Sequence, residues 1–142
     1  MDDELKARLV ARLDKAVRKI GSAELLLAAG EVEDAISRAY YGAYHAAQAL
    51  LLSAGLRPRT HEGTISLFGL HFVETGRVER RLGRALSRAR EDRENGDYAE
   101  VAFFDQDDAR RAITDAREMV DVARRLTGIP APAKDGPKPG AG

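Results

Sequence analysis

The chain has 142 residues, no cysteine, and 23 basic against 23 acidic residues, so its formal net charge is zero. This length predicts one domain with a single core, and the lack of cysteine excludes disulfides, thiolate metal sites and a cysteine nucleophile. Zero net charge gives no whole-molecule attraction to nucleic acid, so such binding needs a local patch. The acidic N-terminus lacks a signal-peptide pattern and no stretch is long and apolar enough to cross a membrane, so we expect a cytoplasmic protein.

The first predicted helix covers about residues 5–27. Its apolar residues step by four and three, which is typical of one face of an amphipathic helix. They are Leu5, Leu9, Leu13, Ala16, Ile20, Ala23 and Leu27. The pair Ala29-Gly30 predicts the end of this helix.

The second predicted helix runs from Glu31 to Gly55, and its polar residues are sorted in an unusual way. One face is an apolar stripe made of Ile36, Tyr40, Ala43, Ala47, Leu50, Leu51 and Ala54. The opposite face carries Asp34, Arg38, Tyr41, His45 and Gln48, and small residues lie between the two faces. An ordinary exposed helix face carries Lys and Glu, so this face is predicted to bind something.

The rest of the chain predicts three further helices. A short one has Ile65, Phe68 and Phe72 inward, and a fourth runs from about Val78 to a stop at Asn95-Gly96. The last begins at the acidic pair Asp105 and Asp108 and continues to about Leu126. No strand alternation appears, so the predicted fold is all-α: an up-and-down bundle of four long helices plus one short helix over residues 1–127. Residues 128–142 are rich in Pro, Gly and Ala, and we expect a disordered tail.

Arg38 and His45 are the first candidates for chemistry. They are seven residues apart, about 10 Å along the helix axis, so one chain hardly lets both touch one small group. Two copies crossing about a two-fold axis would bring both pairs around one phosphate. His45 could then act as general base towards a 2′-hydroxyl or as general acid to the leaving oxygen. Arg38 would hold the phosphate, and no metal or other cofactor is required.

Other residues on this face supply supporting roles, and a structural interpretation stays open beside them. Tyr41 or Gln48 could orient a ribose or a base. In the structural interpretation, His45 is a hydrogen-bonded residue between helices, and Arg38 pairs with Asp34 at the favourable four-residue spacing.

Three segments, in order along the chain, resemble signatures of HEPN domains (higher eukaryote and prokaryote nucleotide-binding). They are Arg38-Ala-Tyr-Tyr-Gly-Ala-Tyr-His45-Ala-Ala, Thr60-His-Glu-Gly63 and Arg93-Glu-Asn-Gly-Asp-Tyr98. The similarity extends from the first helix to about Leu126. The Arg-(six residues)-His spacing is weak alone, and three matching segments in order make the resemblance fairly specific.

The resemblance implies a helical bundle that dimerises, with the Arg and His motifs of both protomers lining a shared cleft. Active members are metal-independent endoribonucleases, and many small ones are toxins paired with a minimal nucleotidyltransferase antitoxin. On this analogy Arg38 and His45 are the catalytic residues. Two positions depart from the family's pattern: Ala39 stands where active nucleases often have a polar residue, and Ala47 stands where some members carry a modified Tyr.

The fourth predicted helix adds a basic stripe, formed by Arg77, Arg80, Arg81, Arg84 and Arg88. Arginines in a row can follow a phosphate backbone and stack on unpaired bases, so Arg84 and Arg88 join Asp34, Tyr41 and Gln48 as candidate substrate-binding residues. A solvated charged face is the alternative. His61, in the loop before the short helix, either contacts the edge of the cleft or caps and packs that helix.

Three functional hypotheses follow from these patterns. The leading one is the toxin ribonuclease described above. The second is a non-catalytic module that uses the Asp34–Gln48 face to bind a nucleotide or a partner protein, with Ala39 marking lost activity. The third is an adaptor that joins proteins through helix–helix contacts.

Overall fold

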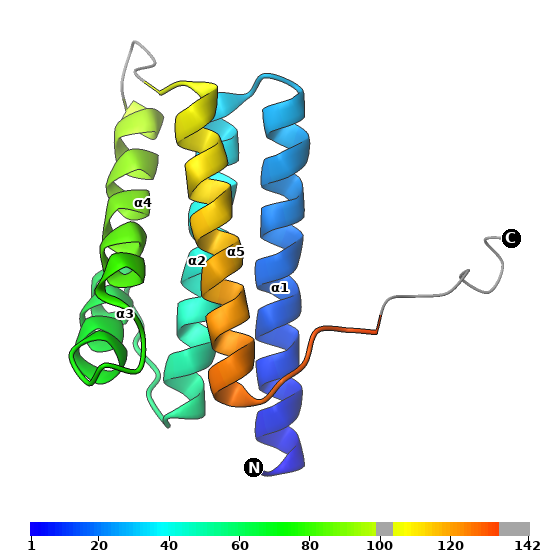
Figure 1. The fold of residues 1–142 in the computed structure, drawn as a ribbon, viewed down its shortest axis with the longest axis vertical. Coiled ribbons are helices and arrows are strands. Elements are labelled where there is room, and N and C mark those ends of the chain that lie inside the picture. The colour runs from blue at the N-terminus through cyan, green and yellow to red at the C-terminus, as the bar shows by residue number, and fades with distance from the viewer. Residues whose placement is uncertain (99–103, 134–142) are drawn as a thin grey trace, which may run out of the picture.

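A computed structural model describes residues 1–98 and 104–133, with the backbone alone for residues 89 and 92–98. Five α-helices and one π-helical segment make up this part of the chain (Figure 1). In chain order they are α1 (Asp3–Ala28), α2 (Val32–Ser53), α3 (His61–Phe68), η1 (Gly69–Val73), α4 (Arg80–Tyr98) and α5 (Gln106–Thr127). These described residues contain no strand. The predicted all-α bundle is confirmed.

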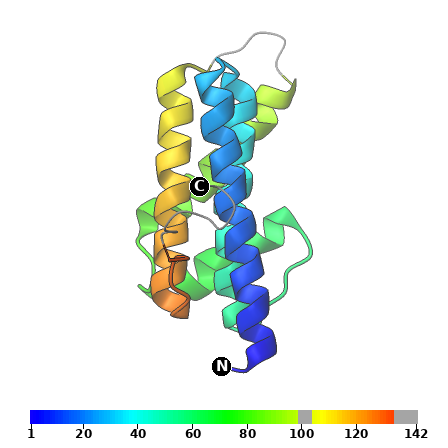
Figure 2. The same ribbon diagram turned by 90° about the vertical axis from the view of Figure 1, so that its right-hand side faces the viewer.

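The four long helices run alternately up and down, and α2 lies behind α5 in Figure 1, with α1 on one side and α4 on the other. Figure 2, which faces α1, shows α5 on one side of this helix and the loop of residues 54–60 on the other. That loop joins α2 to α3. The arrangement makes α2 the central helix of the bundle, while part of its polar face borders α1 and the loop.

The apolar periodicity of α1 and α2 predicts the core correctly. Leu9, Leu13 and Ile20 of α1 are buried, as is the α2 stripe apart from Ala54, which caps the helix and is exposed. A Cβ placed on Gly42 would lie 2.6 Å from Cγ1 of Ile20. The small residues of α2 therefore let α1 and α2 approach closely, which fixes how the two helices face one another.

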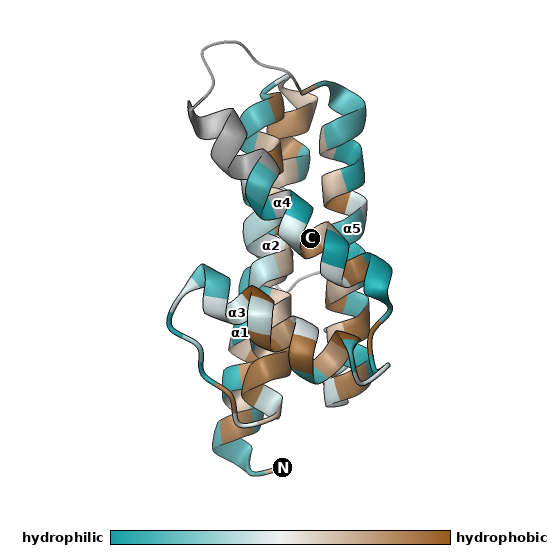
Figure 3. Cartoon of the chain, turned by 90° about the vertical axis from the view of Figure 1, so that its left-hand side faces the viewer, coloured by the Kyte–Doolittle hydropathy of each residue, from teal (hydrophilic) through white to brown (hydrophobic). Residues whose placement is uncertain are grey.

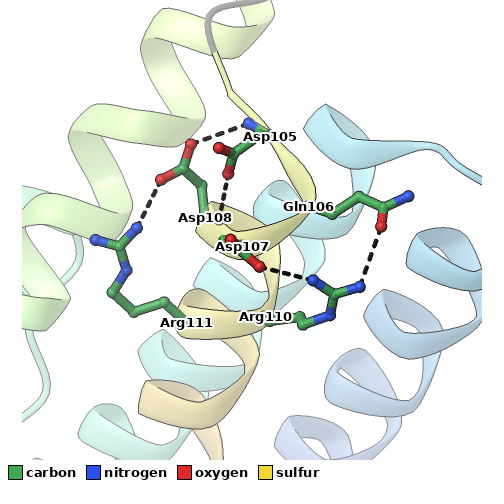
Figure 4. A network of polar contacts seen from close by, with 6 residues as sticks. All are labelled: Asp105, Gln106, Asp107, Asp108, Arg110 and Arg111. Carbon is green, nitrogen blue, oxygen red and sulfur yellow. Dashed lines mark hydrogen bonds and ion pairs between the residues drawn. The ribbon is translucent and has the colours of Figure 1, made fainter.

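The start of α5 forms the capping arrangement that its acidic residues predict (Figure 4). The Asp105 carboxylate accepts from the backbone N–H of Asp108 at 2.9 Å, and the Asp108 carboxylate accepts from the Asp105 N–H at 3.0 Å. Hydrogen bonding by the Asp108 backbone is the main cause that lowers the pKa of Asp105. At the other end Gly128, with φ of 75°, ends the helix in a left-handed conformation.

Two boundaries differ from the sequence prediction. The helix α4 continues to Tyr98, so the stop predicted at Asn95-Gly96 is wrong; Gly costs only about 1 kcal/mol in a helix and does not forbid one. The short helix begins at His61, because the Thr60 hydroxyl accepts from the Gly63 N–H at 2.8 Å and caps the helix earlier than predicted.

The two short elements and the ends of the chain complete the bundle. Phe68 and Phe72 are buried as predicted, and the α3–η1 segment is largely apolar, whereas much of α4 is hydrophilic (Figure 3). After α5, Ile129 is 4% exposed and packs on the core. Residues 134–142 of the predicted tail lie outside the described residues. Among the described helices, none is long and apolar enough to cross a membrane.

Candidate functional site

The polar face of α2 divides into an exposed end and a half-buried end. Asp34 and Arg38 are exposed, whereas Tyr41, His45 and Gln48 are half-buried. Within residues 1–98 and 104–133, the Arg38 side chain forms no hydrogen bond or ion pair, so the pairing with Asp34 considered above is absent. Two helical turns separate Arg38 from His45, and no hydrogen bond joins them in the described chain. Arg38 is therefore available to a ligand or to another chain.

His45 is held by a residue of the neighbouring helix, Arg12 of α1. The Arg12 Nη1 lies 3.3 Å from Nδ1 of His45 and donates to Oε1 of Gln48 at 2.7 Å. The Gln48 amide in turn donates from Nε2 to the hydroxyl of Tyr44 at 2.8 Å. The Arg12 guanidinium therefore connects His45 and Gln48 of the predicted binding face. Gln48 in turn connects this group to Tyr44 of α2.

This contact determines where the proton of neutral His45 sits. Arginine has only donors, so Nδ1 of His45 must be the acceptor, and the neutral ring carries its proton on Nε2. The nitrogen with a free lone pair is thus the one that Arg12 occupies. His45 can donate a hydrogen bond from Nε2 without any rearrangement, whereas accepting a proton at Nδ1 requires Arg12 to leave.

His45 is neutral at physiological pH. Its pKa is lowered from 6.5 to about 4, mainly because burial disfavours the charged ring, with smaller contributions from Arg12, Lys15 and Lys19 of α1. A negatively charged ligand beside His45 would act in the opposite direction, because it would stabilise the imidazolium.

Two tyrosine rings lie near His45, and one of them stacks on a residue of α3. His61, the first residue of α3, stacks on Tyr44 with ring centroids 4.3 Å apart, and its Nδ1 is hydrogen bonded to the Tyr40 hydroxyl at 2.6 Å. The ring of Tyr44 is 5.7 Å from His45, and that of Tyr41 is 6.5 Å away. Of the two alternatives for His61, the structure therefore supports packing at the start of α3, directly against the candidate site.

Sequence reasoning missed Arg12 and Tyr44 as members of this site. A signal for Arg12 was present: a cation directly precedes each of four successive core residues of α1. These pairs are Arg8-Leu9, Arg12-Leu13, Lys15-Ala16 and Lys19-Ile20. A row of cations that follows the core stripe at one residue's offset lies beside the buried face and so next to a neighbouring helix.

The structure places Arg84 and Arg88 away from these contacts, on α4. Both line a groove of about 520 Å³ formed with α3 and η1, and none of its lining residues is among those described around His45. Arg88 lies 3.5 Å from the Asp115 carboxylate of α5. The structure therefore brings Tyr41, His45 and Gln48 together and leaves Arg84 and Arg88 as a separate surface.

No group of three or more His, Asp or Glu side chains that could hold a metal ion occurs among the residues that the structure describes.

The helical bundle agrees with comparison to known proteins. The model of the HEPN domain family matches residues 9–126, and the chain belongs to this family.

Several relatives share this similarity. UPF0332 protein PH1297 of Pyrococcus horikoshii is 51% identical over 74 residues, which cover 52% of each chain. A UPF0332 protein of Thermotoga maritima is 34% identical over 107 residues, covering 75% of this chain and 81% of the relative. A protein of Methanocaldococcus jannaschii that carries the name "Putative toxin MJ0605" is 31% identical, covering 88% of this chain and 92% of the relative.

Proposed function

We propose that this chain is a metal-independent endoribonuclease that acts as the toxin of a HEPN/nucleotidyltransferase toxin–antitoxin pair. Membership of the HEPN family and the name of the Methanocaldococcus jannaschii relative support a toxin role. The observation that carries the catalytic part is the presence, on one face of α2, of an exposed Arg38 that has no partner among the described residues and of a neutral His45 held by Arg12.

The proposed site is completed by a second copy of the chain. Arg38 and His45 are about 10 Å apart along α2, so a single protomer does not bring both to one phosphate. In a homodimer whose α2 helices cross, Arg38 of one protomer and His45 of the other would meet at the same phosphate.

The proposed reaction is attack of a ribose 2′-oxygen on the adjacent phosphorus, with cleavage of the bond to the 5′-oxygen. The proton of the 2′-hydroxyl passes to a base and the leaving 5′-oxygen takes up a proton, so the products carry a 2′,3′-cyclic phosphate and a 5′-hydroxyl. His45 is the proton-transfer residue, and Arg38 offsets the charge on the phosphate oxygens. As a base, His45 acts after the phosphate has drawn Arg12 away from Nδ1.

The Ala39 departure bears little on this proposal. Ala39 is 1% exposed and lies in the core of its own bundle. A side chain at this position points into the protomer, so its polarity does not add a group to the exposed Arg38 surface. Tyr41 and Gln48, which border His45, remain the proposed contacts to ribose or base, together with Asp34 at the exposed end.

The decisive experiment is cleavage of total RNA by the purified protein in the presence of EDTA. Wild type should cut RNA to discrete products, and both Arg38→Ala and His45→Ala should reduce the rate at least about 100-fold, a typical effect of losing acid–base catalysis. Ser37→Ala, beside Arg38 on the same helix, is the matched control and should cleave as wild type does.

A mixture of the two inactive variants tests the shared site. If Arg38 and His45 act across the dimer, exchange of protomers creates one complete pair and restores part of the activity. If dimers that contain one protomer of each variant form and the mixture stays inactive, the composite site is contradicted.

A non-catalytic nucleotide- or partner-binding module is the second candidate, and one observation favours it. Arg12 occupies the only free lone pair of neutral His45. In this arrangement His45 cannot accept a proton, but it can still donate a hydrogen bond from Nε2 to a bound ligand. Intact RNA after incubation with well-folded wild type, together with saturable nucleotide binding, would establish this alternative.

A further inference from the structure

A basic groove lies beside the candidate site and is lined by residues of α1, the end of α2 and the loop that joins α2 to α3. Figure 2 shows where α1 and this loop lie. It encloses about 470 Å³. Its cations are Arg8, Arg12, Lys15, Arg18 and Arg57, and no carboxylate is among its described lining residues. We call these five residues and the space they line the α1 groove.

Most of the positive charge of the α1 groove is uncompensated. Lys15, Arg18 and Arg57 form no side-chain hydrogen bond or ion pair with the described part of the protein. Among the described residues, Arg12 donates only to the uncharged Gln48 and His45, so no carboxylate there offsets its charge. Of these five cations, only Arg8 has an acidic partner within the described chain, Glu4 at 2.8 Å, and such an exposed pair is weak. Several unpaired cations around one groove favour an anionic ligand with more than one charge.

Part of the lining of the α1 groove is apolar, and we call this part the floor. Leu52 at the end of α2, with Leu56 and Pro58 of the loop, contributes aliphatic surface between the cations. Ribose and base faces can pack on such a floor while phosphates contact the rim, and the guanidinium of Arg57 can stack on an unpaired base. A lone inorganic anion would make no use of this floor.

The groove also shares a residue with the contacts of His45. Arg12 and Gln48 line the groove, and Arg12 contacts His45 as well. The cations from Arg8 to Arg18 extend over about 15 Å of α1, which is longer than a single phosphate. A chain of phosphates laid along α1 would therefore pass beside the candidate proton-transfer residue, at the level of Arg12.

We propose that the α1 groove binds the phosphodiester backbone of single-stranded RNA and delivers the strand to His45. The RNA identity of the strand rests on the function proposed above, whereas the groove and its charge do not. On this proposal the strand approaches along α1, and the arginines of α4 do not take part.

The test is binding of a fluorescent 2′-O-methyl oligoribonucleotide, which cannot be cleaved through a 2′-hydroxyl, measured by anisotropy. The groove variant is Lys15→Glu with Arg57→Glu. The matched control is Arg80→Glu with Arg84→Glu, which makes the same change in net charge at two exposed arginines of α4 that have no partner in the described chain. Circular dichroism melting of each variant checks the fold, and Lys15→Ala and Arg57→Ala replace the double variant if it does not fold.

The groove variant should weaken binding at least tenfold, and the control less than twofold. Loss of two phosphate contacts should also make the slope of log affinity against log salt shallower by about 1.4. Equal losses in the groove variant and the control, or no loss in the groove variant, would overturn the proposal. A dinucleotide or a nucleoside triphosphate that binds as tightly as a ten-nucleotide strand would also overturn it, because the groove would then be a nucleotide site.

Binding and cleavage fail separately in this design. Groove-dependent binding by a wild type that never cleaves RNA would disprove the proposed nuclease and leave the groove assignment intact. Normal cleavage and binding by the groove variant would disprove the groove assignment and leave the nuclease intact.

Discussion

The two basic surfaces of this protein differ in what lies opposite their cations. On α4, Arg81 is 2.5 Å from Glu118 of α5, and Arg88 is 3.5 Å from Asp115. In the α1 groove, Arg12 faces only uncharged groups and three further cations have no partner in the described chain. A row of arginines is conspicuous in the sequence of α4, yet α5 neutralises part of it. The carboxylates on the neighbouring helix, more than the number of cations, therefore determine where an anion can bind.

The largest difference between the two surfaces is expected in the cleavage rate after one cation is removed from each. Arg12→Ala should lower the rate of RNA cleavage by about 10- to 100-fold, because a charged hydrogen-bond donor beside a phosphate contributes about 1.5–3 kcal/mol. Arg84→Ala, the matched change on α4, should cost less than about threefold. The measurement is the initial cleavage rate at equal protein concentration, and similar losses in both variants would remove the distinction.

The helix contacts beneath the two surfaces should also respond differently to a methyl group. Gly42→Ala places a Cβ 2.6 Å from Ile20 and 3.3 Å from the backbone oxygen of Ala16, so it should lower the free energy of unfolding by about 1–3 kcal/mol. Gly83→Ala in α4 meets only the Val73 side chain at 2.9 Å, and the better helix propensity of Ala offsets about 1 kcal/mol of any strain. Urea unfolding of both variants checks this contrast; a more stable Gly42→Ala protein would contradict the close packing of α1 on α2.

The pKa of His45 should respond to a substitution in the α1 groove and not to one on α4. Removing the cation in Arg12→Ala should move the pKa of His45 up from about 4, although burial, the main cause of the low value, remains. NMR titration of the ring protons measures this shift, with Arg84→Ala as the control that leaves it unchanged.

The same shift has a consequence for stability. The folded chain holds the His45 proton more weakly than the unfolded chain, so the free energy of unfolding falls as the pH drops from about 6.5 to about 4. Arg12→Ala should make this fall smaller. A steeper loss of stability in acid would show that Arg12 does not depress the pKa.

The smallest effect would come from making α4 resemble the α1 groove. Replacing the opposing carboxylates, in Asp115→Asn with Glu118→Gln, leaves Arg88 without its ion pair and Arg81 with only the 3.7 Å contact to Glu79, and should tighten RNA binding about two- to threefold. The free energy of unfolding should change by less than about 1 kcal/mol, because both ion pairs are partly exposed. Anisotropy measures the RNA affinity and urea unfolding the stability. Unchanged RNA affinity would show that charge compensation by α5 is not the reason why the α4 arginines bind RNA weakly.

Local patterns in the sequence were enough to predict the helices and the core, since the relevant forces act within one element. The burial of Leu50 on α2 follows from helical periodicity, and the Asp105–Asp108 cap follows from residues three apart. The Asn95-Gly96 boundary misled, because a local propensity was outweighed.

The candidate site could be predicted only in part, because its contacts cross between helices. His45 stood out through its place on α2, but its partner Arg12 is 33 residues away and depends on the rotation of α1 against α2. The stacking of His61 on Tyr44 likewise depends on where α3 turns back on the bundle. For Arg88, the sequence shows the cation on α4 but not that the carboxylate of Asp115 on α5 lies opposite it.

The clustering of tyrosines around the candidate site has a practical consequence. The chain contains no tryptophan and four tyrosines, of which Tyr40, Tyr41 and Tyr44 lie together on α2. Intrinsic fluorescence of the protein therefore arises mainly from this one place, with no indole emission to mask it. Since the Tyr40 hydroxyl is bonded to His61 and that of Tyr44 to Gln48, a molecule that disturbs either contact should alter the emission. The protein thus carries its own optical reporter of occupancy, and unlabelled ligands can be screened against it directly.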